Sequence, residues 1–172
     1  TSIGDSALRE CNKLTSVTFE NPDVVLGPSV FADCDGLVSI QLPTRLKELS
    51  YGMFSGCAKL KNVTIPSTVT KMGSTVFADC DSLVSITVPG NVKSLGQQAF
   101  DFCNNLETII FEEGVESLGW ICIRNAPSLK KVVLPSSITT IEKENFEECP
   151  NVVVYVNCGS VAHRYAQSNG VA

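Results

Sequence analysis

Cysteine recurs along this chain at every twenty-third position. The column consists of Cys11, Cys34, Cys57, Cys80 and Cys103, continues with Ala126 and ends with Cys149. Three apolar columns keep the same interval with no insertion: Leu or Val three positions after each slot, mostly Phe three before it, and an aliphatic residue or Met eight before it. A fixed period of this length is the signature of a repeat architecture. The chain must therefore fold as a stack of similar coils.

Each repeat contains the pattern of one short strand. After the cysteine slot the chain reads Leu-x-x-Val/Ile-x-hydrophobic, as in Leu60, Val63 and Ile65. The β-branched alternation of Val63 and Ile65 predicts a half-buried strand. A proline follows the strand at Pro43, Pro66, Pro89 and Pro135, where a missing N–H ends the strand without breaking a ladder. One repeat alone leaves its strand edges open, so neighbouring repeats must stack with Leu on Leu and Phe on Phe.

The full pattern is Ile-x-x-x-x-Phe-x-x-Cys-x-x-Leu-x-x-Val-x-Ile-Pro, and it is clearest in segments 54–66 and 77–89. It resembles the BspA-like leucine-rich repeats of bacterial and trichomonad surface proteins. The resemblance implies an α/β-type repeat solenoid, a right-handed curved coil of short parallel strands and turns. We expect about seven coils over residues 3–157. The family also implies extracellular or cell-surface display and a role in adhesion or partner binding.

The last residues, 158–172, depart from the repeat and predict a helical cap. Ser160 is a suitable N-cap, Val161, Ala162 and Tyr165 share one helical face, and Gly170 stands just past the predicted end. A disordered tail is the alternative. The chain also opens inside a repeat, so we expect a longer parent protein whose N-terminal part is missing. We expect a monomer, with end-to-end association through an uncapped first coil as the alternative.

Charge and hydropathy exclude two classes of partner. The chain has a net charge of −5, whereas a protein that binds the phosphate backbone of a nucleic acid needs a basic surface. No apolar run reaches the ~20 residues of a membrane-spanning helix, so no membrane insertion is expected.

The cysteines are expected to be core residues rather than reactive groups. Equivalent positions in stacked coils point the same way, and Ala126 shows that a small apolar residue suffices there. There is no Cys-x-x-Cys pair and only one histidine, so zinc templates are not met and no metal or cofactor is expected. Cys122 lies off the column, and a disulfide between Cys149 and Cys158 stays open as an alternative. His163 is expected on the solvent face of the cap helix, and no catalytic motif is present.

Segment 112–116 replaces the proline turn with an acidic one that contains Glu112, Glu113 and Glu116. Clustered carboxylates are typical calcium ligands. An exposed, solvated turn is the favoured interpretation.

A partner is expected on the face that carries the strands, which is concave in leucine-rich repeat proteins. The candidate binding residues are the outward positions Gln41, Lys61, Thr64, Thr87, Glu107, Ile110, Lys131 and Val133. This set contains no Trp, Tyr or Arg, the usual anchors of protein interfaces. A merely filled β surface, with binding in missing coils, is the alternative.

Trp120 is the candidate anchor on the convex side. It stands in a column that is otherwise mostly polar, within an irregular repeat. It either contacts a partner or covers its distorted coil.

These observations predict a non-catalytic extracellular interaction or adhesion module that binds a protein or glycan ligand, such as host extracellular matrix or mucin. The alternative is a structural spacer or stalk that displays another domain. A thiol enzyme is the third and least supported hypothesis.

Overall fold

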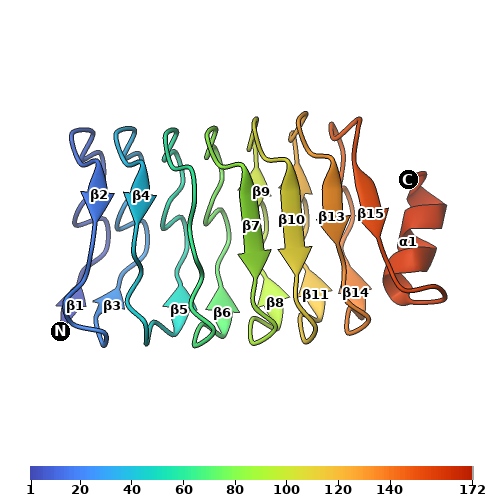
Figure 1. Ribbon diagram of the computed structural model, residues 1–172, viewed down its shortest axis with the longest axis horizontal. Helices are drawn as coiled ribbons and strands as arrows, with labels where there is room; N and C mark the ends of the chain where they lie inside the picture. The colour runs from blue at the N-terminus through green and yellow to red at the C-terminus, as the bar shows by residue number, and fades with distance from the viewer. Residues whose placement is uncertain (172) are drawn as a thin grey trace.

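The computed structural model describes residues 1–171, and it shows a parallel β-solenoid of about seven turns with one C-terminal helix (Figure 1). We number the coils 1 to 7 along the chain, one for each repeat, beginning at residue 1. The coils stand side by side, with the N-terminus at one end of the stack and the helix at the other. This is the predicted repeat solenoid.

Strands run in three rows along the stack. The front row contains β2 (Ser16–Val17), β4 (Ser39–Ile40), β7 (Ser85–Val88), β10 (Thr108–Phe111), β13 (Lys131–Val133) and β15 (Val153–Tyr155). The side row contains β1 (Ser2–Ile3), β3 (Val25–Leu26), β5 (Glu48–Leu49), β6 (Lys71–Met72), β8 (Ser94–Leu95), β11 (Ser117–Leu118) and β14 (Thr140–Ile141). The back row is β9 (Phe100–Asp101) and β12 (Ile123–Arg124). All pairs are parallel, and most are offset by one repeat, as in Ile86↔Ile109↔Val132.

The side row was not predicted from the sequence. Its strands have two residues each, with one side chain out and one toward the core, as in β8 with Ser94 and Leu95. Two residues show no alternation long enough to distinguish a strand from a turn.

The predicted columns of identical side chains form the core. Phe31, Phe54, Phe77 and Phe100 stack with ring centroids 5.4–5.8 Å apart and planes within 10° of parallel. The leucine column runs beside them and is fully buried from coil 2 to coil 6. Each side chain therefore buries its apolar surface on the same residue type in the next coil.

We predict that Phe77→Ala lowers the free energy of unfolding by ~3 kcal/mol or more, because it leaves a cavity in the middle of a continuous stack. Urea-induced unfolding would measure this. Lys61→Ala, on the exposed surface, should change stability by no more than ~0.5 kcal/mol. Equal costs for the two variants would show that the inward and outward positions are wrongly assigned.

A glycine column lets the coils approach closely on the side row. A β-carbon added to Gly27 or Gly73 would lie 2.7 Å from a backbone nitrogen of the preceding coil, and one added to Gly96 would lie closer still. Ser50 occupies this column in coil 3, and there β3 and β5 do not pair. Its hydroxyl donates to the Leu26 carbonyl at 3.3 Å, where other coils use a backbone N–H. Glu142 also brings a β-carbon into this column, but its backbone N–H still donates to the Leu118 carbonyl at 3.0 Å, so the exchange of a backbone bond for a hydroxyl bond is particular to coil 3.

We predict that Gly96→Ala destabilises the protein by ~1–3 kcal/mol, because the new methyl group overlaps the backbone of coil 4. Gly4→Ala is the matched control, since a β-carbon at Gly4 meets no atom within 4 Å. Thermal unfolding of both variants provides the comparison. A loss of stability in Gly4→Ala as large as that in Gly96→Ala would contradict the close-approach explanation.

The predicted strand at Val63 and Ile65 is wrong. Coil 3 contributes only an isolated bridge to the front row, Ser39↔Asn62, and no regular strand. Asn62 stands where most other coils have Ser or Thr, and asparagine is depleted in strands. The side chains of coil 3 still alternate as predicted, with Val63 and Ile65 facing the core. The front row is consequently interrupted between β4 and β7.

The helix α1 (Val161–Asn169) closes the C-terminal end as predicted. The Ser160 hydroxyl accepts the His163 N–H at 3.0 Å, and Gly170 adopts φ 65° at the helix end. Ala162 and Ala166 are buried, and the Tyr165 ring meets Phe146 edge-on at 6.2 Å. The helix therefore covers the last aromatic ring of the core. Ala172, the final residue of the predicted cap segment, lies outside the described residues.

Asn145 supports this closure and was missed from the sequence. It is buried at 4% exposure in a column that otherwise holds Ala, Val, Met and Cys. Its side-chain oxygen accepts the Ile123 N–H at 3.0 Å, in place of a backbone carbonyl of coil 7. Its own carbonyl accepts the Tyr165 hydroxyl at 3.3 Å. The sequence did contain a signal for this role, because Asn145 is a polar residue in a column that is otherwise apolar.

Candidate functional site

The outward side of the front row, here called the front face, carries all eight predicted binding residues. Six are exposed and the other two, Ile110 and Val133, are half-buried. Strand register aligns Thr87, Ile110, Val133 and Tyr155 in one column across β7, β10, β13 and β15. The structure thus brings the predicted residues to one surface; their role in binding stays a prediction.

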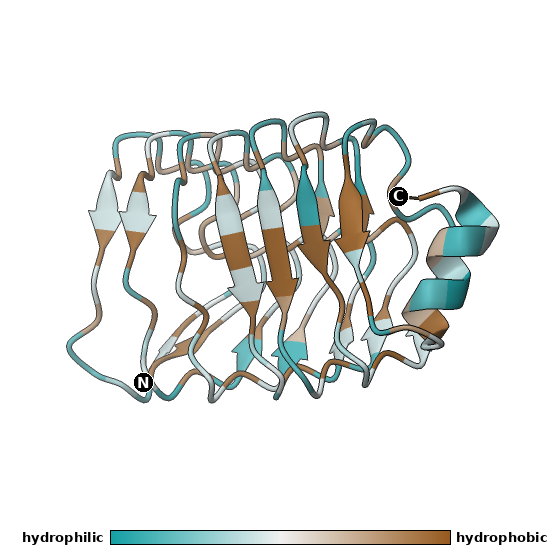
Figure 2. Ribbon diagram, turned by 45° about the vertical axis from the view of Figure 1, so that its right-hand side comes forward, coloured by the Kyte–Doolittle hydropathy of each residue, from teal (hydrophilic) through white to brown (hydrophobic). Residues whose placement is uncertain are grey.

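The front face changes character along the stack. Coils 2 to 4 present Gln41, Thr64 and Thr87, whereas coils 5 to 7 present Ile110, Val133 and Tyr155 in the same column. Figure 2 shows this change as a higher apolar content in β10, β13 and β15.

Tyr155 is the aromatic residue on this face that sequence reasoning missed. It is 52% exposed, and the Lys131 ammonium lies 5.2 Å from its ring centroid. β13 and β15 pair as Lys131↔Val153 and Val133↔Tyr155, an offset one residue shorter than the regular repeat. An interval of 23 residues would instead place Val156 beside Val133. Counting by the repeat therefore assigns Val156, and not Tyr155, to the outward column.

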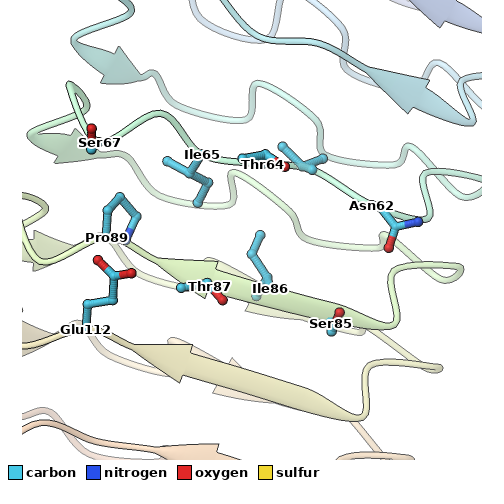
Figure 3. A pocket seen from close by; sticks show the side chains of 10 residues that line it. Asn62, Thr64, Ile65, Ser67, Ser85, Ile86, Thr87, Pro89 and Glu112 are labelled. Carbon is cyan, nitrogen blue, oxygen red and sulfur yellow. The ribbon is translucent and has the colours of Figure 1, made fainter. Parts of the chain in front are cut away.

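Two adjoining hollows occupy the front face where the row is interrupted. The first has a volume of about 380 Å³ and is lined by Asn62, Val63, Thr64, Ile65, Ser67, Ser85, Ile86, Thr87, Pro89 and Glu112 (Figure 3). The second, of about 510 Å³, is lined by Ile40, Gln41, Leu42, Thr44, Thr64, Pro66 and Ser67. They share Thr64 and Ser67, so together they form one groove, here called the coil 3 groove.

The groove lies where the main-chain pairing of coil 3 stops, just after the bridge at Asn62. The Gln41 N–H donates to the Val17 carbonyl at 2.9 Å, and the same bond would join each further pair of coils. Within residues 1–171, the N–H groups of Thr64 and Thr87 have no such acceptor. Main-chain groups need a partner, so these two are available to water or to a ligand.

The hydroxyl groups of the groove are also uncommitted. Thr68, at the nearby turn, donates to the Thr44 and Leu46 carbonyls at 3.0 and 2.8 Å. By contrast, threonine hydroxyls within residues 1–171 make hydrogen bonds at Thr68, Thr70 and Thr139 and none at Thr64 or Thr87. The groove therefore offers donors and acceptors that the fold itself does not use.

The acidic turn has a structural role and is not simply solvated. Glu113 accepts both the hydroxyl and the backbone N–H of Ser136, at 2.8 and 3.1 Å, and these bonds lower the pKa of its carboxyl group. Glu112 accepts the Gly90 N–H at 3.3 Å. Within residues 1–171 no three His, Cys, Asp or Glu side chains come together as a metal site.

A buried ion pair on the back of the solenoid belongs to the irregular repeat. Asp101 is 2% exposed and accepts from Arg124 at 3.3 Å and from Asn125 at 2.9 Å. These bonds join coils 5 and 6 where Ala126 and Pro127 replace the usual Cys and polar residue. The pair is remote from the coil 3 groove and holds coils together.

The slot cysteines from Cys34 to Cys149 are core thiols, as predicted, whereas Cys11 in the first coil is only half-buried. The Cys57 thiol donates to the Phe31 carbonyl at 3.1 Å, and Cys80 and Cys103 repeat this bond with the phenylalanine of the earlier coil. All eight cysteines are free, Cys149 and Cys158 included, and only Cys158 is exposed. Burial raises the pKa of Cys57, Cys103 and Cys122 to about 12, so these thiols are protonated and unreactive near neutral pH.

We predict that these thiols make the fold sensitive to alkali. Their pKa is about 12 in the folded chain and 9.0 as the ordinary value, so the unfolded state alone loses the proton above pH 9. Each thiol then removes ~1.4 kcal/mol of stability per pH unit between pH 9 and 12. Cys57→Ala, which places in the slot the residue found at Ala126, should reduce this slope in urea unfolding.

The control for this measurement is Cys158→Ala, which removes an exposed thiol and should leave the slope unchanged. An unaltered pH dependence in Cys57→Ala would mean that the Cys57 thiol is not shielded from solvent.

Trp120 is 41% exposed at a corner of coil 6, in the column that also exposes Tyr51 at 59%. The following residue, Ile121, has φ 53°, and its equivalents in the other coils have φ of 53–61°, namely Ser6, Ser29, Gly52, Thr75, Gln98 and Glu144. The corner beside Trp120 therefore has the regular backbone conformation of the repeat. It contributes nothing to the coil 3 groove.

The prediction for His163 is wrong: it is half-buried rather than on the solvent face. Its Nδ1 accepts the Gly159 N–H at 3.0 Å, so the ring closes the turn before the helix. No cysteine or serine side chain bonds to this ring within residues 1–171.

The fold and this groove define a leucine-rich repeat scaffold with a ligand-sized hollow on its strand face. The BspA type leucine rich repeat region matches the chain in six copies, over residues 1–97 and 24–153. The chain belongs to this family. Its repeat fold is generally non-enzymatic. Within residues 1–171 no helix is long and apolar enough to cross a membrane.

Solved structures of bacterial leucine-rich repeat proteins are similar. One from Bacteroides ovatus is 29% identical over 91% of this chain, with a TM-score of 0.83. A leucine-rich repeat protein of T. pallidum is 25% identical over 98% of this chain and 76% of its own length, with a TM-score of 0.82. The pneumococcal vaccine antigen PcpA shares the fold, with 16% identity over 77% of this chain and 38% of its own length and a TM-score of 0.57. The chain spans 40% of the Bacteroides ovatus protein. A search among curated proteins finds no match.

Proposed function

We propose that this chain is a non-catalytic extracellular interaction module that binds a protein or glycan ligand on its front face. The coil 3 groove carries this proposal: it is concave, its two parts measure about 380 and 510 Å³, and it exposes unused hydrogen-bonding groups. Ligand pockets in proteins span about 300–1,000 Å³, and both parts of the groove fall in that range.

The expected ligands are those of a surface adhesin, such as host extracellular matrix or mucin. This expectation rests on the surface location of BspA-like proteins and on the absence of a paired nucleophile and base in the described residues. The front face offers a second contact area next to the groove in Ile110, Val133 and Tyr155. Tyrosine is a frequent interface anchor, so this area favours a partner over an inert surface.

A structural spacer is the second candidate. The regular phenylalanine stack favours it, because a rigid rod built from repeats holds two ends at a fixed distance. The spacer needs no specific surface, whereas the interaction module does.

We predict that a triple variant with Lys61→Glu, Thr87→Glu and Lys131→Glu loses at least ten-fold in affinity for whatever matrix protein, mucin or glycan binds this chain. Three new carboxylates would change both the shape and the charge of the front face. Surface-immobilised ligands and the purified chain provide the measurement. Trp120→Ala is the control on the other side of the coils and should bind normally.

The two variants distinguish the hypotheses. Binding that survives in the triple variant and disappears in Trp120→Ala would move the site to the convex side. The absence of any ligand for the unaltered chain would favour the spacer.

A further inference from the structure

We propose that the ligand of the coil 3 groove is a neutral oligosaccharide, held across coils 2 to 5. This inference rests on the proposed function and specifies the ligand class for that same site. It follows from the charge of the lining, from its hydrogen-bonding groups and from the interrupted main-chain ladder.

Charge excludes anionic ligands. Glu112 is the only ionised side chain among the residues that line the two hollows. A phosphate, sulfate or sialic acid would meet this carboxylate without any lysine or arginine in the lining to compensate. Neutral and cationic ligands remain, and the hydroxyl and amide groups of the lining favour a neutral one.

The lining also lacks the groups that anchor a protein partner. It contains no Trp, Tyr or Arg, and its apolar residues, such as Ile65, Ile86 and Pro89, form a narrow, mostly buried floor. A protein side chain would find little apolar area to cover. A hydroxyl-rich ligand depends less on apolar contact, because its polar groups can bond to the polar groups around the floor.

The polar groups around that floor match sugar hydroxyls. Thr64, Ser85 and Thr87 each offer a hydroxyl that both donates and accepts, and Asn62 and Gln41 offer amides that do the same. Sugar hydroxyls have this dual character, so each contact satisfies both partners. In Figure 3 the Asn62 and Thr64 side chains come from coil 3, while those of Ser85 and Thr87 come from β7.

The interrupted ladder adds main-chain groups to this set. The N–H groups of Thr64 and Thr87 have no backbone acceptor in the described chain, and each lies next to a free hydroxyl. The front row supplies this combination only where pairing is lost, because in β10 and β13 the ladder uses the same groups. If coil 3 paired regularly with both neighbouring coils, these main-chain groups would be used in the ladder and the site would not form.

Glu112 lies at the end of the groove, and one of its two carboxylate oxygens accepts a hydrogen bond within the described chain. Oε2 accepts the Gly90 N–H, while Oε1 makes no hydrogen bond within residues 1–171. A carboxylate oxygen fixed in this way accepts a sugar hydroxyl through a charge-assisted bond. Glu112 therefore orients the ligand, and its charge also repels anionic glycans.

The test is a glycan array that carries neutral, sulfated and sialylated glycans, probed with the unaltered chain. The protein should be produced in a bacterial host, because Asn62-Val63-Thr64 matches the N-glycosylation sequon and a glycan on Asn62 would fill the groove. The strongest neutral glycan is then titrated by calorimetry. We expect Thr87→Val, which keeps the side-chain shape and removes the hydroxyl, to weaken its binding about ten-fold.

Thr108→Val is the matched control, since Thr108 lies in the next strand of the front face and does not line the groove. It should bind with unchanged affinity. Glu112→Gln is a second variant, and it should weaken neutral glycans while it relieves the exclusion of sulfated ones. Unfolding midpoints of all variants, measured in parallel, show whether a lost affinity reflects a lost fold.

The outcomes separate this inference from the broader proposal. Neutral glycans that bind and depend on Thr87 support it. Binding of sulfated or sialylated glycans alone, or equal losses in Thr87→Val and Thr108→Val, would overturn it. A matrix protein that binds the front face and is not displaced by neutral glycans would also overturn it, but would leave the interaction module intact. No ligand of any kind would defeat both.

Discussion

No coil of this solenoid is stable by itself, because each buries its apolar side chains only against the same side chains of its two neighbours. The phenylalanine rings of coils 2 to 5 stack at 5.4–5.8 Å, and the glycines of the side row let the backbones approach until hydrogen bonds form. These two contacts fix the distance between coils. They also explain why the repeat length is so regular, since an insertion would shift every column against the next.

The coil 3 groove lies where this regularity is relaxed. Asn62 brings a poor strand former into the front row, and regular pairing is lost beyond it. The lost hydrogen bonds leave free polar groups, and the lost contact leaves a hollow. The proposed site therefore coincides with a local irregularity, as sites commonly do in proteins whose other parts are locally consistent.

The sequence predicts the features that repeat and misses those that occur once. The period alone is enough to place Phe77 and Leu83 in the core, and local capping chemistry is enough to locate the helix after Ser160. The coil 3 groove could not be predicted, because it depends on a gap between two coils that the repeat makes look equivalent. Tyr155 was hidden by a repeat that is one residue short, and Asn145 by its place in a column assumed to be apolar. A count of departures from each column would have marked Ser50, Asn62 and Asn145.

The unequal bonding around coil 3 has a mechanical consequence. On the back of the solenoid the bonding is continuous: the Asp33 N–H donates to the Ser55 carbonyl and the Gly56 N–H to the Ala78 carbonyl, at 2.7 and 2.9 Å. On the front and side the same junctions are partly open. A bending force on the solenoid would therefore act mainly at coil 3, where the back turns would serve as a hinge and the front face would open or close. A ligand bound to both sides of the groove would resist this bending. A force that opens the front face would in turn weaken the binding of the ligand.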